Sequence, residues 1–176
     1  YATVAFATPF KHGKHFAGFD AGGFGFGGYS ESRIGLTYAT TLFERLSIGA
    51  KINYTRFAIP DYGAKSALFA DVGINCILSK HISVGFSISN ATRSELLRDL
   101  DEKIPTTIDA GLAYQLSDKV LIVADVEKQV NFPVSFRGGV EYAVAKFLRV
   151  RAGASTQPVT LNAGFGVNVK ALNIDF

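Results

Sequence analysis

The side chains best suited to chemistry in this sequence are seven charged residues in its C-terminal half. Each lies inside a stretch of alternating polar and apolar residues, on the polar side. They are Asp109, Asp125, Glu127, Arg137, Glu141, Arg149 and Arg151. If neighbouring stretches pair as strands, acidic and basic members come within cross-strand reach. Such a set either selects solutes in a polar lumen, plugs that lumen by ion pairing, or keeps the shape of a barrel as a structural network, which is the interpretation we favour.

Other motifs give weak chemical signals. The run GGFGFGG at 22–28 lacks the Lys-Ser/Thr ending of a phosphate-binding loop and is not followed by a helical pattern, so it predicts a strand and a turn. His12 and His15 have no companion carboxylate or cysteine cluster, and their segment is typical of a polar turn. GxSxG, HExxH and a recognisable Ser/His/Asp set are absent. We therefore expect no catalytic, metal-binding or cofactor-binding residues and no enzyme activity.

The composition limits the class of protein to which the chain can belong. The chain has 176 residues, is 48% hydrophobic and 19% charged, and suits one domain spanning 1–176. Its formal net charge of +3 comes from cations spread along the chain, which does not indicate nucleic-acid binding. There is no apolar run of about 18 residues and no signal-peptide pattern. Because the first residue is Tyr1 and Met is absent, we expect a mature or partial chain that is incomplete at its N-terminus. Truncation at the C-terminus is a second hypothesis.

Alternation with a period of two residues is the main structural signal, since it places successive side chains on opposite faces of a strand. In 46–55, Leu46, Ile48 and Ile52 share one face, while Ser47 and Lys51 share the other. The same pattern recurs in 68–78, 82–89, 108–116, 120–127, 134–142, 148–155 and 159–169. We predict about ten to twelve strands, of the roughly 9–11 residues that a tilted strand needs to cross a bilayer.

The connections between these strands alternate in length. Short turns are expected near 43–45, 80–81, 117–119, 145–146 and 170–171, and long loops near 27–31, 58–65, 90–105, 129–133 and 156–158. An antiparallel meander sends every second connection to the same end. Short turns at one rim and longer loops at the other are typical of outer-membrane barrels, in which the longer loops are external.

A soluble β-sandwich or lipocalin-like barrel is the alternative, with the apolar residues pointing inward. The polar face argues against it, because that face consists mainly of Gly, Ser, Thr, Asn and Ala instead of a dense charged coat. Tyr38, Tyr54, Tyr114 and Tyr142 lie on the apolar faces, as in the aromatic belts of membrane proteins, although Trp is absent. The sequence predicts an all-β, transmembrane, antiparallel up-and-down β-barrel in a bacterial outer membrane, surrounded by lipid.

The strand period stops in SELLRDLDEKIP, 94–105. Leu96, Leu97 and Leu100 have helix-like spacing and Ser94 could cap a helix, which predicts a short helix in the longest external loop. These four residues are candidate contacts for a protein partner or for a lid over the pore. The alternative is that the helix only packs over the barrel mouth.

Several segments resemble a known family. They are ERLSIGAKINY (44–54), HISVGFSISN (81–90), IPTTIDAGLAYQLSD (104–118), VLIVADVEKQV (120–130), FRGGVEYAVAKFLRVRAG (136–153) and LNAGFGV (161–167). They are similar to the later strands of the PorV and PorQ-like proteins of Bacteroidota, within the FadL-like fatty-acid transporter superfamily. The resemblance implies a barrel of about fourteen strands with an N-terminal segment in the lumen. That segment and its Asn-Pro-Ala type motif are absent from this sequence, which puts a ligand pathway in doubt.

The resemblance implies two alternative functions. Some members serve type IX protein secretion, and the first hypothesis is a PorV/PorQ-like accessory or structural component of an envelope complex, with envelope proteins as partners. Other members import hydrophobic molecules, and the alternative is a FadL-like passive transporter of hydrophobic or small solutes, with a hydrophobic ligand. A filled barrel suffices for the first function, whereas the second needs a continuous lumen.

Overall fold

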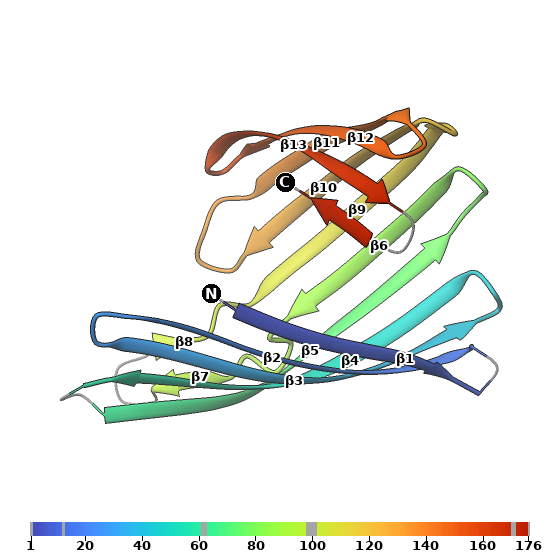
Figure 1. Ribbon diagram of the computed structural model, residues 1–176. Coiled ribbons are helices and arrows are strands. Elements are labelled where there is room, and N and C mark those ends of the chain that lie inside the picture. The colour runs from blue at the N-terminus through green and yellow to red at the C-terminus, as the bar shows by residue number, and fades with distance from the viewer. Residues whose placement is uncertain (1, 12, 61–62, 98–101, 170–171, 176) are drawn as a thin grey trace. The chain divides into compact units, whose positions relative to one another are not determined.

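The computed structural model describes residues 2–11, 13–60, 63–97, 102–169 and 172–175 (Figure 1). Twelve strands form one sheet in the order β1-β2-β3-β4-β5-β6-β9-β10-β11-β12-β13-β14, and β7 and β8 form a separate two-stranded sheet. The main sheet follows chain order apart from that insertion, so each strand pairs with its neighbours in the sequence. This is the predicted all-β, up-and-down architecture, with a strand number inside the predicted range.

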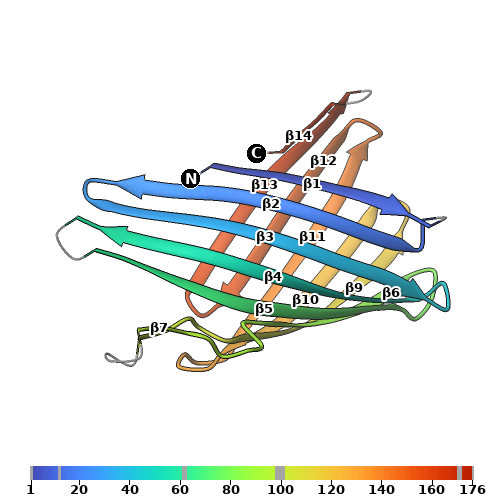
Figure 2. The same ribbon diagram turned by 90° about the horizontal axis from the view of Figure 1, so that it is seen from below.

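The chain folds as two compact units, Tyr1–Ile74 with Ser87–Thr107, and Asn75–Phe86 with Ile108–Phe176. Strands β5 and β6 contribute residues to both. The first unit holds β1 Ala2–Phe10, β2 His15–Phe26, β3 Tyr29–Leu42, β4 Leu46–Ile59, most of β5 Gly63–Ile77, the end of β6 Ile82–Ser89, β7 Glu95–Leu97 and β8 Glu102–Lys103. Figure 2 shows β1 to β5 following one another side by side.

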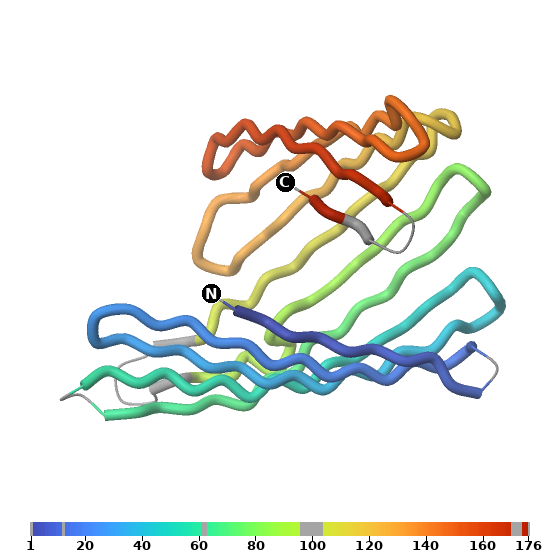
Figure 3. The backbone as a smooth tube through the Cα atoms, in the orientation of Figure 1, coloured from blue at the N-terminus to red at the C-terminus, as the bar shows by residue number. Residues whose placement is uncertain are grey.

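The second unit is a meander of shorter strands, which the backbone trace of Figure 3 follows back and forth. Its strands are β9 Thr107–Ser117, β10 Val120–Gln129, β11 Ser135–Ala145, β12 Leu148–Thr156, β13 Val159–Val169 and β14 Leu172–Asp175, with parts of β5 and β6. The pairs β10–β11, β11–β12, β12–β13 and β13–β14 are antiparallel. Most of these strands have the 9–11 residues that a tilted transmembrane strand requires.

Apolar side chains point away from the protein in both units. On β11, Phe136, Val140 and Tyr142 are exposed, while Arg137 and Glu141 between them are half-buried. Among the described residues only two apolar side chains are buried, Ala67 and Phe69. Tyr38, Tyr54, Tyr114 and Tyr142 are all on exposed apolar faces, as predicted. A soluble sandwich would bury these faces, which argues against the soluble alternative. No helix in the described ranges is long and apolar enough to cross a membrane.

Three of the predicted long loops are wrong, because strands continue through most of their length. One of them, 156–158, is only the two-residue connection 157–158 between β12 and β13. Gly27 and Gly28 alone connect β2 to β3, and both have positive φ angles, which glycine adopts without strain. The polar residues after them looked like a loop, yet Glu31 pairs directly with Phe24. In the predicted loop 58–65, β4 runs to Ile59 and β5 starts at Gly63. The strands β3, β4 and β5 have 14, 14 and 15 residues, more than a bilayer crossing needs.

The helix predicted for 94–105 is also wrong in the described part of that segment. Glu95–Leu97 and Glu102–Lys103 are short strands that pair antiparallel, and 98–101 lie outside the described residues. Three leucines at helix-like spacing are too short a pattern to stabilise a helix. The two arms of the loop pair as strands instead, because their bases lie close together. The predicted short turns are short connections in the structure. The turn predicted at 170–171 lies outside the described residues.

Candidate functional site

Arg137 on β11 is the centre of the first group of charged residues. Its Nε donates to Asp125 Oδ1 at 2.7 Å, its Nη1 donates to Glu127 Oε2 at 2.7 Å and its Nη2 donates to Asp109 Oδ1 at 2.9 Å. Asp125 lies directly opposite Arg137 on β10, and Asp109 is reached from β9 across that strand. We call these four residues the Arg137 cluster. With three carboxylates around one guanidinium, it carries an excess of negative charge when all four groups are ionised.

The other predicted charges form a second group on the same face of β11 and β12. Arg151 Nε donates to Glu141 Oε2 at 2.6 Å, and Arg149 Nη1 lies 3.6 Å from Glu141 Oε1. Arg151 Nη1 also donates to Asp175 Oδ1 at 2.7 Å. Asp175 on β14 was missed by sequence reasoning. The signal was available, because Leu172 and Ile174 alternate with it, so a continued strand puts Asp175 on the polar face.

The structure thus brings all seven predicted residues into ion pairs, as two groups. The side chains of Asp109, Asp125, Glu127 and Glu141 are 23–35% exposed, and those of Arg137 and Arg151 are 40% exposed. At this exposure water screens the charges partly, so each contact stabilises the fold only modestly. Their assignment to the lumen of a closed barrel stays a prediction.

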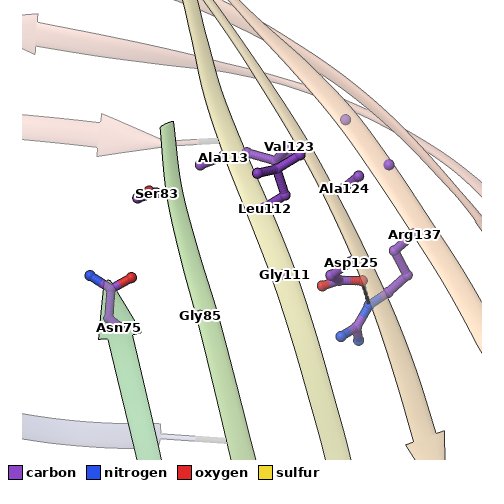
Figure 4. A pocket seen from close by; sticks show the side chains of 12 residues that line it. Asn75, Ser83, Gly85, Gly111, Leu112, Ala113, Val123, Ala124, Asp125 and Arg137 are labelled. Atoms are coloured by element: carbon purple, nitrogen blue, oxygen red, sulfur yellow. Dashed lines mark hydrogen bonds and ion pairs between the residues drawn. The ribbon is translucent and has the colours of Figure 1, made fainter. Parts of the chain in front are cut away.

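A hollow lies on the polar face beside the Arg137 cluster, within the second unit (Figure 4). It has a volume of about 400 Å³. Figure 4 shows the side chains of Asp125 and Arg137 pointing toward one another at one edge, with Asn75 and Ser83 contributed by β5 and β6. Its floor consists largely of small residues, which leave the backbone accessible; they are Ser83, Gly85, Gly111, Ala113 and Gly139. A solute can therefore approach both the charged pair and peptide groups there.

A further ion pair, in the first unit, was not predicted. Lys51 Nζ on β4 contacts Asp20 Oδ1 on β2 at 2.7 Å, so the pair spans β3 between them. It crosses directly over Gly35, where an added Cβ would lie 2.6 Å from Asp20 Oδ1. The same arrangement recurs in the second unit, where the contact of Arg151 with Asp175 passes Gly166 on β13. Glycine on the middle strand is what permits each pair to form.

Four aromatic rings gather on the polar face of the first unit, next to the Gly27–Gly28 turn. Phe24 and Phe26 on β2, Tyr29 on β3 and Phe57 on β4 have ring centroids 5.5–6.5 Å apart. Glu31 accepts from Tyr29 Oη at 3.4 Å and from Arg33 at 3.3 Å. The glycine-rich run 22–28 forms the predicted strand and turn. The aromatic group itself was missed, because the phenylalanines were not assigned to a face.

The histidines considered for metal binding fall in different situations. His15 Nδ1 lies 2.7 Å from Tyr38 Oη on the apolar face, and its ring stacks on Phe10 with centroids 5.5 Å apart. His12 lies outside the described residues. Among the described residues no group of three or more His, Cys, Asp and Glu could hold a metal ion.

Asn90 organises the base of the long loop 90–106. Its side chain is fully buried, its Nδ2 donates to Ile104 O at 2.8 Å and its Oδ1 accepts from Ser94 N at 2.9 Å. Its backbone N–H donates to Asp71 Oδ1 at 2.9 Å, and Asp71 Oδ2 accepts from the buried Asn53 at 2.7 Å. The two arms of the loop are therefore fixed to the middle of β5. Sequence reasoning missed this role of Asn90.

The four residues proposed as loop contacts are only partly described. Ser94 belongs to the anchored base, where its Oγ donates to Leu68 O at 2.6 Å. Leu96 and Leu97 lie on β7. Leu100 lies outside the described residues. A contact of these residues with a protein partner stays a prediction.

No family model matches the chain, and no curated protein matches it. Among solved structures, a FadL homologue of Pseudomonas aeruginosa is similar with a TM-score of 0.67 and 12% identity, covering 98% of this chain and 68% of that one. The chain has the fold of an outer-membrane β-barrel.

Two further structures support the same fold. A KdgM porin has a TM-score of 0.57 at 9% identity, and a KdgM porin in complex with disordered oligogalacturonate has a TM-score of 0.58 at 10% identity. Each match covers 95% of this chain and 91% of the other. The resemblance to FadL-like barrels is confirmed at the level of the fold, while membership of the PorV and PorQ type stays a prediction. This fold and the exposed apolar faces agree with the predicted outer-membrane location, because lipid is the solvent that such faces require.

Proposed function

We propose that this chain is the barrel wall of a passive outer-membrane transporter, in which solutes move along the polar face. One observation carries the proposal. Apolar side chains cover the outward face, while the polar face holds the hollow beside the Arg137 cluster instead of a packed core. A water-filled conduit needs a polar, incompletely filled face of this kind. The fold shared with porins and a FadL homologue supports the proposal.

Charge suggests which solutes pass. The Arg137 cluster has three carboxylates around one guanidinium, so its field attracts cations and repels anions. Small neutral or cationic solutes are therefore the favoured class. The hydrophobic ligands of FadL-like transporters are a less direct fit to this polar hollow, although the aromatic group beside Gly27 and Gly28 offers them a contact surface.

The test is reconstitution of the full-length protein into planar bilayers and vesicles. We expect discrete conductance with a preference for K⁺ over Cl⁻, and vesicle swelling in small neutral sugars. Arg137→Gln should increase the cation preference, because it removes the only positive charge of the cluster. Arg93→Gln is a matched control in the long loop. Folded, inserted protein with neither conductance nor swelling would refute transport.

An accessory role in an envelope complex, of the PorV/PorQ-like kind that serves type IX secretion, is the second candidate. The anchored base of the loop 90–106 favours it, because Asn90 holds both arms of a hairpin in one arrangement. A fixed hairpin is suited to partner binding, since little conformational entropy is lost on association. Replacing 95–103 by a Gly-Ser linker, which keeps Asn90, should abolish co-purification of envelope proteins from native membranes. An unchanged set of co-purified proteins would refute this role.

A further inference from the structure

Lysines occupy every described turn at one end of the second unit. The connections 78–81, 118–119 and 146–147 contain Lys80, Lys119 and Lys146, all exposed, and one acidic residue, Asp118. None of the three forms an ion pair within the described part of the chain. The connections at the opposite end of this unit, 130–134 and 157–158, contain no charged residue. The turns at one end of the second unit therefore carry charged residues, and the turns at its other end carry none.

Backbone hydrogen bonds place these turns in a row. Gln115 N–H donates to His81 O at 2.7 Å, Ala143 N–H donates to Lys119 O at 2.8 Å, and Asn168 N–H donates to Phe147 O at 2.9 Å. Each bond ties one turn to the strand that leads toward the next. Because every turn joins two strands about 4.8 Å apart, successive lysines are spaced by about 10 Å. The result is a row of separate lysines, with the acidic Asp118 next to the middle one.

The first unit has basic residues in the short connections at one of its ends. Its connections 11–14 and 43–45 carry Lys11, Lys14 and Arg45 against one acidic residue, Glu44. Thr41 N–H donates to Lys14 O at 2.8 Å, which places these two turns side by side. At the opposite end of this unit, Gly27 and Gly28 are uncharged, and the loop 90–106 has three cationic and four anionic residues. We call these five connections of the two units the short-turn ends; together they hold six Lys or Arg residues and two acidic residues, Glu44 and Asp118.

Aromatic rings accompany the cations. Phe43, 88% exposed, is two residues from Arg45, and Phe147, 58% exposed, follows Lys146. On the adjoining apolar face, Phe10, His15 and Tyr38 stack, and His15 Nδ1 contacts Tyr38 Oη at 2.7 Å. Amphipathic rings of this kind gather at the level of lipid headgroups. The short-turn ends therefore lie where the apolar face meets the headgroup layer.

We propose that the short-turn ends bind the phosphate headgroups of anionic phospholipids in the leaflet that adjoins them. Basic residues close to a bilayer surface attract anionic lipid, and lysine can keep its stem in the apolar layer while its ammonium group reaches the headgroups. Charges repeated turn by turn, each beside apolar residues, fit a ring of lipids better than the single epitope of an acidic protein. The proposal does not depend on whether the barrel transports solutes.

The experiment uses the full-length protein in vesicles of phosphatidylcholine that contain a spin-labelled probe lipid. The label is carried by phosphatidylglycerol or by phosphatidylcholine, and the motionally restricted fraction gives the selectivity between them. We expect a preference for phosphatidylglycerol that decreases with added salt. The triple variant Lys80→Gln, Lys119→Gln, Lys146→Gln should lose most of this preference, by up to about fivefold for each lysine.

Two control variants separate a local site from net charge. Lys65→Gln, Arg93→Gln, Lys128→Gln removes the same charge away from the short-turn ends and should leave the selectivity unchanged. Lys80→Arg, Lys119→Arg, Lys146→Arg should retain it. Heat-modifiable gel mobility checks that each variant is folded.

Three results would overturn the proposal. They are native protein without a preference for phosphatidylglycerol, an equal loss in the Lys65/Arg93/Lys128 control, and displacement of the labelled lipid by a soluble polyglutamate peptide at low concentration. The last result would point to an acidic protein partner.

Discussion

Arg137 and Asp125 face each other directly across β10 and β11, and Arg137 Nε donates to Asp125 Oδ1 at 2.7 Å. The same guanidinium bonds Glu127 on β10 and Asp109 on β9. One side chain on the polar face thereby links three successive strands. Loss of that side chain leaves three carboxylates close together without their shared cation.

Arg137→Gln should lower the free energy of unfolding by about 1–2 kcal/mol, because the remaining carboxylates repel one another. The value lies below that of a fully buried pair, since the side chain is 40% exposed. Equilibrium unfolding in urea, with the protein refolded into vesicles, measures it. Arg149→Gln, which removes a single contact of 3.6 Å, should cost less than about 0.5 kcal/mol. Equal costs for the two variants would contradict the central role of Arg137.

Gly35→Ala should destabilise the protein by about 1 kcal/mol, because the new Cβ meets the ion pair of Asp20 and Lys51 that crosses over it. At Gly25 the nearest atom to an added Cβ is a backbone oxygen at an ordinary 3.4 Å, so Gly25→Ala should be neutral or slightly stabilising. Urea unfolding midpoints compare the two variants.

A mutant cycle identifies the cause of the Gly35→Ala effect. In a background with both Asp20→Ala and Lys51→Ala the cost of Gly35→Ala should largely disappear, because neither crossing side chain is left. An undiminished cost would show that the backbone, and not the ion pair, rejects the methyl group.

Asn90→Ala should loosen the loop 90–106 without unfolding the strands. The substitution removes the bonds to Ile104 O and Ser94 N and leaves those half-buried groups without their partner, at a local cost of about 2 kcal/mol. Amide hydrogen exchange should accelerate by about 30-fold in 91–106 and remain unchanged in β10 to β12. Asn162→Ala, at an exposed position with one weak contact of 3.5 Å, is the control. Uniform acceleration along the chain would instead indicate global destabilisation.

Ile122 and Val123 are adjacent apolar residues on opposite faces of β10. Val123 lines the hollow beside Asp125, while Ile122 is on the exposed apolar face. Ile122→Lys should therefore cost about 2–4 kcal/mol if it lies near the bilayer midplane, and Val123→Lys should cost close to zero. Folding free energies in vesicles compare them directly. A reversed order would place the lipid on the other face.

The local pattern of the sequence was sufficient for most strands after Leu46 and for their faces. Side chains alternate with a period of two on any strand, so Phe136 and Val140 could be assigned to one face and Arg137 and Glu141 to the other without knowledge of their partners. The tight turns at 43–45 and 118–119 were predictable for the same reason, since each interrupts a clear alternation.

The contacts between side chains on different strands depended on the cross-strand register. The pairing of Arg137 with Asp109 spans a strand, and the pair of Asp20 and Lys51 needs Gly35 beneath it, so neither follows from one segment alone. Ser30 and Glu31 resembled a loop until their pairing with β2 made them strand. Asn90 is a polar residue like many others in the sequence, and only the approach of Asp71, Ser94 and Ile104 makes it the buried anchor of a loop. Periodicity is a property of each strand, whereas register, burial and hydrogen-bond partners depend on which strands lie beside it, and that is a property of the tertiary structure.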